Sequence, residues 1–165
     1  MIRRELLLAT AIIASVLTAC SDTTAPNKPG SEGSSSSSFQ RSGALHITKE
    51  CHEYFGRAGD HCTIIASNLP LIPVGARVFY LMAADLEHGT YDGEVELRVQ
   101  RGNVAFGHVI VTDLFSTVPH TTIGNASFSG GTGRFKGFHG QIVVSVSSNP
   151  SNADWDGTYS FGGRE

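Results

Sequence analysis

Apolar and polar residues alternate along short stretches of the C-terminal two thirds of the chain, and turn residues separate these stretches. In residues 94–99, Val95, Leu97 and Val99 fall on one face of an extended strand, and Arg98 falls on the other face with two acids. Alternation of this kind predicts eight strands, at residues 44–49, 61–67, 76–84, 94–99, 104–112, 121–128, 135–147 and 155–161. This part of the sequence shows no long helical period.

The connections between the predicted strands are short and contain Gly, Pro and Asn. Short connections imply that strands adjacent in sequence run antiparallel. Eight such strands close most economically into a β-barrel, which leaves no exposed edge, and two packed sheets are the alternative. We therefore expect an all-β domain over residues 39–165, an eight-stranded antiparallel β-barrel with an apolar interior.

The first residues, 1–19, have the pattern of an export signal. Arg3 and Arg4 precede an apolar run at residues 6–17, which is shorter than the roughly 20 residues of a membrane-spanning helix. The run ends in Leu-Thr-Ala-Cys, which resembles the lipobox of bacterial lipoproteins. The resemblance implies that Cys20 is lipidated and anchors the protein to a membrane of the cell envelope. The alternative is an ordinary signal peptide cleaved nearby.

The residue after this cysteine bears on which membrane would hold the anchor. Ser21 stands where lipoproteins retained at the inner membrane usually have Asp, so the resemblance implies the outer membrane if the cell is Gram-negative. Residues 21–38 then consist mainly of Ser, Thr, Pro and Gly and include five consecutive serines. Such a composition buries too little apolar surface to fold, so we expect residues 20–38 to be a disordered linker with a reach of roughly 23 Å.

The composition excludes several functional classes. The chain of 165 residues has a formal net charge of -3 and scattered basic residues, which gives no electrostatic footprint for binding nucleic acid. It has no Gly-x-Ser-x-Gly elbow, no phosphate-binding loop and no His-Glu-x-x-His motif, which argues against hydrolases and nucleotide-binding enzymes. We expect no metal and no cofactor.

Two cysteines remain in the predicted domain, Cys51 and Cys62. An exported protein lives where thiols oxidise, so we expect a disulfide that stabilises the fold by roughly 3 kcal/mol. Alternatively, the two cysteines with His52 and His61 would form a Cys₂His₂ zinc site, which requires turns at both ends because adjacent residues in an extended chain point to opposite faces. Free thiols are the third possibility.

A glycine-rich motif precedes the seventh predicted strand. Residues 129–142 read Ser-Gly-Gly-Thr-Gly-Arg-Phe-Lys-Gly-Phe-His-Gly-Gln-Ile, which resembles the signature of plant allene oxide cyclases, dirigent proteins and bacterial proteins with the same barrel. Residues 74–80 and 155–161 are similar to strands of that family. We expect the glycines to allow positive φ in a tight connection, and Phe135 and Phe138 to plug layers of the barrel on opposite sides of the pleat. The resemblance also implies association of barrels into homo-oligomers.

The resemblance has one clear departure. Dirigent proteins have an Arg where this chain has His139, which argues against the coupling chemistry of that branch. Strict alternation places His108 on one face with Val104, Phe106 and Ile110, and so predicts an imidazole in the barrel lumen. The candidate catalytic residues for proton transfer are His108, His139 and Asp113. The alternative is that these three residues are hydrogen-bonded positions in the wall or at the rim of the barrel. The candidate ligand-binding residues are aromatic: Phe106, Tyr80, Phe138, Tyr159 and Trp155.

Three functions remain open. The first is a membrane-anchored barrel that binds a small hydrophobic or aromatic molecule, and the second is a cyclase or isomerase that uses the cavity. The third is a structural or interaction protein with a packed core. An apolar lumen without ionisable groups favours binding, and two titratable side chains that converge on it favour catalysis. A lumen filled by Phe106, Phe128, Phe138 and Trp155 favours the structural protein.

Overall fold

The structure is a computed structural model, and it describes residues 41–100 and 102–162. The predicted signal peptide, the lipidation site Cys20 and the serine-rich linker lie outside the described residues. The part of the chain that is described contains no helix long and apolar enough to cross a membrane.

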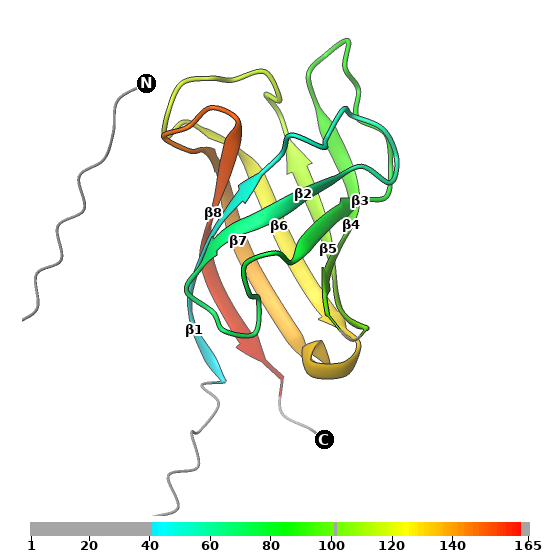
Figure 1. Ribbon diagram of the computed structural model, residues 1–165, viewed down its shortest axis with the longest axis vertical. Coiled ribbons are helices and arrows are strands. Elements are labelled where there is room, and N and C mark those ends of the chain that lie inside the picture. Colours follow the sequence, from blue (N-terminus) through cyan, green and yellow to red (C-terminus); the bar gives the residue numbers. More distant parts are fainter. Residues whose placement is uncertain (1–40, 101, 163–165) are drawn as a thin grey trace, which may run out of the picture. The chain divides into compact units, whose positions relative to one another are not determined.

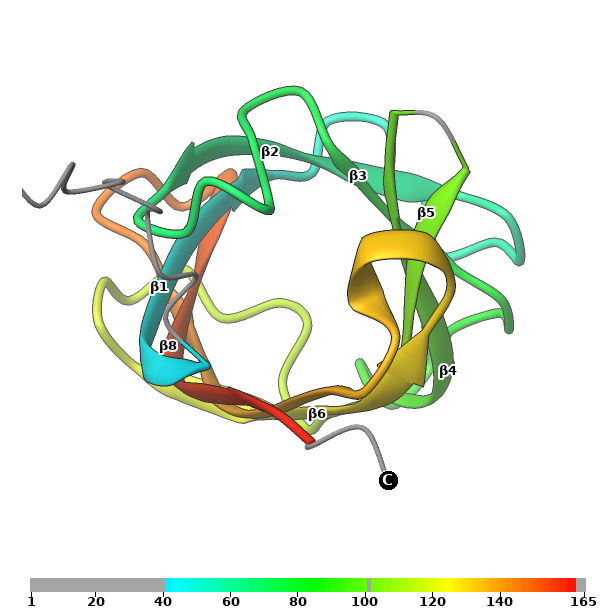
Figure 2. The same cartoon turned by 90° about the horizontal axis from the view of Figure 1, so that it is seen from below.

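The described residues form one closed barrel of antiparallel strands, in which each strand pairs with the next and β8 pairs with β1 (Figures 1 and 2). The predicted all-β, eight-stranded antiparallel barrel is confirmed, and the alternative of two packed sheets is wrong. The strands are β1 Ser42–Glu50, β2 His61–Ser67, β3 Arg77–Tyr80, β4 Tyr91–Val99, β5 Asn103–Val111, β6 Thr122–Gly131, β7 Phe138–Val146 and β8 Asn152–Phe161.

Two predicted strands are longer than the observed ones. The strand predicted at residues 76–84 ends at Tyr80, because the chain turns away from the sheet after Leu81, whose N–H still donates to the carbonyl of Glu94. The strand predicted at 135–147 begins at Phe138, because a short 3₁₀ helix, η1 Gly133–Phe135, occupies the preceding turn. The strand predicted at 61–67 has the observed bounds of β2.

The inward face of β5 differs from the prediction. Its buried residues are Ala105, Gly107, Val109 and Val111, so the expected set with Phe106 and His108 points outward, and the predicted lumenal position of His108 is wrong. Both faces of this strand carry apolar residues, so alternation alone does not distinguish them. The inner face needs small residues, because a Cβ at position 107 would lie 2.7 Å from the ring of Phe128.

The described chain begins and ends at the same end of the barrel (Figure 1). Buried aromatic side chains pack together at this end. Seen from this end, the gold turn that contains η1 folds across the opening of the ring (Figure 2). Phe135 of η1 is fully buried, and its ring centroid lies 5.4 Å from that of Phe138. Phe128, Trp155 and Tyr159 continue the same cluster deeper in the barrel. This end of the interior is therefore packed.

The glycine-rich motif builds this closed end. Gly130, Gly133 and Gly137 all have positive φ, as expected. A Cβ at Gly133 would also lie 2.2 Å from Oδ1 of Asn103, so the turn has no room for a side chain there. Phe135 and Phe138 plug the barrel as expected, since both are fully buried. The expectation that they lie on opposite sides of the pleat is wrong, because Phe135 belongs to η1 and packs against Phe138 in the same cluster. The observed role of the motif is structural.

Candidate functional site

The opposite end of the barrel encloses a cavity of about 330 Å³. Its walls come from the ends of strands and from the loops at residues 51–60, 81–90, 112–121 and 147–151, which gather at the upper end in Figure 1. Val111, Ile123, Val144 and Val146 form much of its apolar lining. The interior is thus packed with aromatic rings at one end and hollow at the other.

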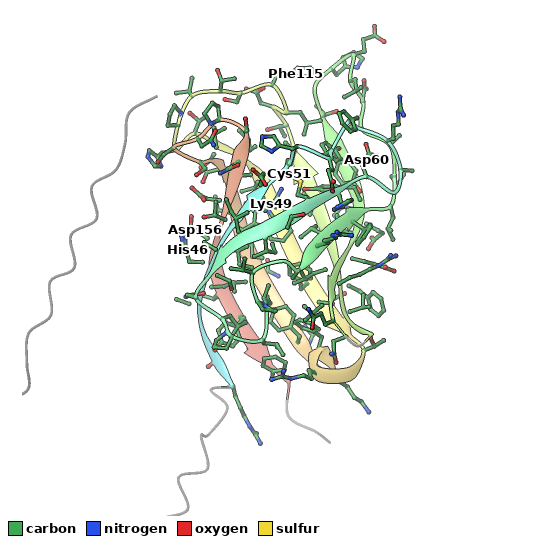
Figure 3. All side chains as sticks on the ribbon, viewed as in Figure 1. His46, Lys49, Cys51, Asp60, Phe115 and Asp156 are labelled. Carbon is green, nitrogen blue, oxygen red and sulfur yellow. A yellow bond between two sulfur atoms is a disulfide. The ribbon has the colours of Figure 1, made fainter. Side chains whose placement is uncertain are left out.

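Large apolar side chains surround the mouth of this cavity. Phe55, Leu86 and Phe115 line it and are 65%, 51% and 62% exposed, and Figure 3 shows Phe115 at this end of the barrel. Two glycines with positive φ let these side chains pack directly on the backbone: a Cβ at Gly56 would lie 2.7 Å from Leu86, and one at Gly89 would lie 2.8 Å from Phe115. The mouth is suited to admit an apolar molecule.

A lysine lies inside the barrel, in the wall of this cavity. Lys49 follows Leu45 and Ile47 on the inward face of β1, and only 4% of its surface is exposed. Its Nζ lies 2.7 Å from Oη of Tyr80. Nζ also lies 5.1 Å from the ring centroid of Trp155 and 5.5 Å from that of Tyr80. Lys49 therefore places an amine against aromatic rings in an apolar enclosure.

The charge of Lys49 is not balanced by an acid. Within residues 41–100 and 102–162, no carboxylate forms an ion pair with its Nζ. Burial without a counterion disfavours the ammonium form, and it lowers the pKa of Lys49 from 10.5 to about 7. Burial also raises the pKa of Tyr80 above its usual value. Near neutral pH the site therefore holds a partly neutral amine beside a protonated phenol.

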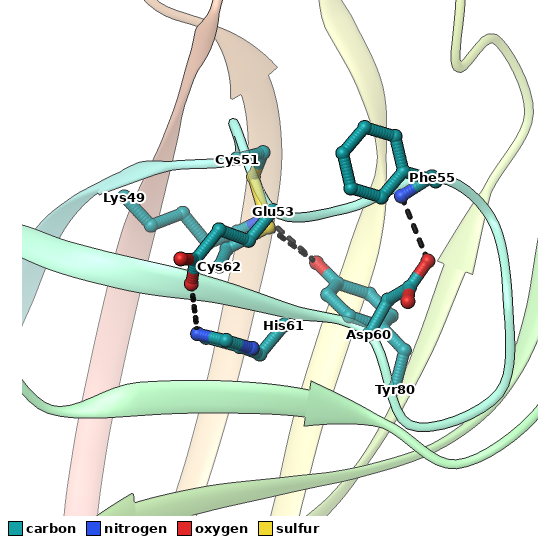
Figure 4. The surroundings of a disulfide bond; sticks show 8 residues. All are labelled: Lys49, Cys51, Glu53, Phe55, Asp60, His61, Cys62 and Tyr80. Atoms are coloured by element: carbon teal, nitrogen blue, oxygen red, sulfur yellow. Dashed lines mark hydrogen bonds and ion pairs between the residues drawn. A yellow bond between two sulfur atoms is a disulfide. The ribbon is translucent and has the colours of Figure 1, made fainter.

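The predicted disulfide between Cys51 and Cys62 is present and lies beside this amine (Figure 4). Because the two sulfur atoms are bonded to each other, the alternative Cys₂His₂ zinc site is wrong. Nζ of Lys49 lies 3.6 Å from Sγ of Cys51 and 3.8 Å from Sγ of Cys62. The Tyr80 hydroxyl lies 3.8 Å from Sγ of Cys62 and can only donate to it, since a disulfide sulfur carries no hydrogen. The disulfide thus forms one wall around Lys49.

Other polar atoms near the cavity have no partner. Oη of Tyr54 and Oδ1 of Asn152 are buried without a hydrogen-bond partner among the described residues, and both residues line the cavity. The Tyr54 ring also packs against Tyr80, with centroids 4.5 Å apart. Buried polar groups in folded proteins usually have partners. Two residues of the cavity lining, Tyr54 and Asn152, therefore carry a buried polar atom that has no partner within the described residues.

The three predicted catalytic residues do not converge on the cavity. His108 is on the outer face of β5, and its imidazole contacts Asp92 at 2.7 Å and Glu94 at 3.1 Å. His139 is exposed on β7, and Asp113 is exposed in the loop after β5. None of the three lines the cavity.

The predicted ligand-binding aromatics fall in three places. Tyr80 lines the cavity. Trp155 is not a lining residue, but its ring lies next to Nζ of Lys49. Phe138 and Tyr159 belong to the packed end of the barrel. Phe106 is on the outside and is 40% exposed, for the same reason as His108: the inward face of β5 is the opposite one.

Sequence reasoning missed Lys49, although a signal for it exists. Leu45, Ile47 and Lys49 share one face of the predicted first strand, so the alternation places a lysine among inward-facing apolar residues. Lysine is almost never fully buried without a partner, which makes such a position informative.

In the described part of the chain, no group of three or more His, Cys, Asp or Glu side chains is arranged to hold a metal ion.

Comparison of the chain with protein-family models, with curated proteins and with solved structures finds no match.

Proposed function

We propose that the barrel binds a small, mostly apolar or aromatic molecule in the cavity at its Phe115 end. The observation that supports this function is an apolar-walled cavity of about 330 Å³ that has Lys49, Tyr54 and Asn152 among its lining residues. Small-molecule sites commonly have about 300–1,000 Å³, apolar walls and a few polar groups that orient the ligand. Lys49, Tyr54 and Asn152 would supply those polar groups, and the apolar rim would admit the rest of the molecule.

The second part of the proposal concerns the location of the protein. The lipobox-like residues before Cys20 support a lipid anchor in the cell envelope, at the outer membrane if the cell is Gram-negative. The strand β1 begins at Ser42, at the packed end of the barrel and away from the cavity mouth (Figure 1). The anchor would therefore join the described residues at the end of the barrel opposite the cavity.

A cyclase or isomerase is the second candidate function, and one observation favours it. Lys49 and Tyr80 are two titratable groups in direct contact in the wall of the cavity, which suits proton transfer to an enclosed substrate. The resemblance of residues 129–142 to the allene oxide cyclase and dirigent signature points to the same class. The catalytic groups would then be Lys49 and Tyr80, because His108, His139 and Asp113 are not among the residues that line the cavity.

Two valines on β7 provide a matched test of binding in the cavity. Val144 is 1% exposed and lines the cavity, whereas Val143 beside it is 43% exposed on the outer face. We expect the wild type to bind an apolar aromatic probe, cinnamyl alcohol, with a saturable change in the fluorescence of Trp155, the single tryptophan of the chain. Val144→Phe should weaken binding at least tenfold by filling the cavity, and Val143→Phe should leave it unchanged.

The outcomes of this test separate the candidates. Calorimetry that shows no binding of cinnamyl alcohol or of comparable apolar probes to the folded wild type would contradict the cavity function and favour a structural protein. Equal loss of binding in both valine variants would place the site elsewhere. Native mass spectrometry of protein purified from its own cell would test acylation of Cys20, the predicted homo-oligomer and a retained molecule in one measurement.

A further inference from the structure

We propose that Lys49 captures the carbonyl group of a small apolar aldehyde or ketone as an imine inside the cavity. This inference rests on the proposed function, because the guest must first enter the cavity. It goes further by naming the chemical class of the guest and the atom that reacts with it.

The geometry favours a nucleophilic amine. Lys49 lines the cavity, and its Nζ is confined by Tyr80, by the disulfide and by the ring of Trp155. No carboxylate in the described part of the chain forms an ion pair with it, so no salt bridge competes for the nitrogen. An amine held in one position beside a small cavity faces a bound carbonyl group in a fixed orientation, which favours reaction between them.

The protonation states support the same reaction. Only an uncharged amine has the lone pair that attacks a carbonyl carbon, and burial lowers the pKa of Lys49 to about 7. A large share of Lys49 is therefore reactive at neutral pH, whereas an ordinary solvated lysine is almost entirely protonated. The rings of Trp155 and Tyr80 near Nζ would stabilise the positive charge of a protonated imine.

The reaction balances without any further reagent. The lone pair of Nζ forms a bond to the carbonyl carbon, and the carbonyl oxygen takes a proton from the Tyr80 hydroxyl. The nitrogen returns a proton to Tyr80, which gives a neutral carbinolamine. Loss of the hydroxyl group with the second nitrogen proton then releases one water and leaves a carbon–nitrogen double bond. The reverse reaction with water releases the guest.

A carboxylate guest is the main competitor, and the site is less suited to it. Such a guest would bring a full negative charge into an enclosure with apolar walls, and Lys49 would have to be protonated to balance it. The neutral donor on Tyr54 and the neutral acceptor on Asn152 match a neutral molecule better. A carbonyl compound requires no buried charge on entry.

Reductive trapping tests the reaction on the full chain. Cinnamaldehyde is incubated with the folded wild type at pH 7 in the presence of cyanoborohydride, which converts an imine into a stable amine, and the adduct is located by peptide mass spectrometry. The exposed Lys136, outside the cavity, is the internal reference. We expect at least tenfold more adduct at Lys49 than at Lys136, although Lys136 is more accessible to the reagent. Val144→Phe should reduce the Lys49 adduct at least tenfold, and Val143→Phe should not.

Cinnamyl alcohol separates the failure of this inference from failure of the proposed function, because it has the same shape but forms no imine. Binding of the alcohol without a Lys49 adduct of the aldehyde, or with equal adducts at Lys49 and Lys136, would overturn the imine and leave the binding function intact. Absence of both binding and adduct would overturn both. Tyr80→Phe should slow formation of the Lys49 adduct at least tenfold when the rates are compared at saturating cinnamaldehyde; an unchanged rate would overturn the role of the Tyr80 hydroxyl.

Discussion

The Nζ atom of Lys49 lies 2.7 Å from the Oη atom of Tyr80 inside the barrel. Burial acts on the two groups in the same way: it disfavours the charged form of each, so it lowers the pKa of the amine and raises the pKa of the phenol. The pair is therefore most stable with both groups neutral. This accounts for a lysine in the interior that has no acidic partner among the described residues, and it leaves a lone pair on Nζ for chemistry.

The first prediction concerns Lys49 and the pH dependence of stability. Because the folded pKa of about 7 is below the usual 10.5, the unfolded chain binds more protons than the folded one between these values, so the free energy of unfolding rises with pH there. At 1.36 kcal/mol per pKa unit, the full difference is about 5 kcal/mol. Lys49→Met should stabilise the protein most below pH 7, and should remove most of the rise between pH 7 and 9.5.

Urea unfolding at several pH values checks this prediction, and Lys136→Met is the control. The exposed Lys136 should change neither the stability nor its slope with pH. A wild-type stability that does not rise between pH 7 and 9.5 would show that the Lys49 amine stays protonated, and so would a Lys49→Met variant that keeps the wild-type slope.

Most of the fold could be predicted from the sequence, because period-2 alternation and turn residues are local signals. The exceptions are instructive. On β5 both faces carry apolar residues, and the decision between them depends on the ring of Phe128, which comes from β6 and fills the space inside Gly107. The length of the third strand depends on where the chain leaves its neighbours, which is also a property of the assembled barrel.

The site was harder to predict because it depends on what the barrel encloses. The sequence indicates histidines as candidate catalytic residues because they are titratable, but His108 lies on the outer face of the barrel, where it contacts Asp92 and Glu94. Lys49 has the more unusual environment, because lysine side chains are usually exposed and this one is buried. Its position on the inward face is visible in the sequence. Its contact with Tyr80, and the lack of an acidic partner in the part of the chain that is described, become visible only once β1 and β3 lie in the same wall.

The second prediction concerns the disulfide. Cys51 and Cys62 are 11 residues apart, and closing a loop of this size stabilises the folded state by about 3 kcal/mol in the chain-entropy model. Reduction should therefore lower the Tm by roughly 10 °C. Thermal unfolding with and without a phosphine reductant measures the effect. In the double variant Cys51→Ser with Cys62→Ser the reductant should have no effect, and a wild-type Tm that does not respond to complete reduction would contradict the prediction.

The third prediction compares two phenylalanines. Phe135 is fully buried in the closed end, whereas Phe106 is 40% exposed on the outside of β5. Phe135→Ala should lower the free energy of unfolding by about 3–5 kcal/mol, and Phe106→Ala by less than about 1 kcal/mol. Both should keep the affinity for cinnamyl alcohol, because neither residue lines the cavity. Equal destabilisation in urea unfolding would contradict the orientation of β5.

The last prediction concerns His108 on the outer wall. Its imidazole interacts with Glu94 and Asp92, and the hydrogen bond to the Glu94 carboxylate is the main reason why the pKa of His108 is raised above 6.5. Protonation of His108 therefore favours the folded state: this contribution is fully present below pH 6.5 and is lost as the pH rises through the folded pKa. Glu94→Gln should lower the pKa of His108, as measured by NMR titration of the imidazole. Glu96→Gln is the matched control, because Glu96 pairs with Arg98 instead. If the pKa of His108 does not change in Glu94→Gln, the hydrogen bond to Glu94 is not what raises it. If the pKa falls equally in both variants, the cause is the general negative charge on this face of the barrel and not the specific contact with Glu94.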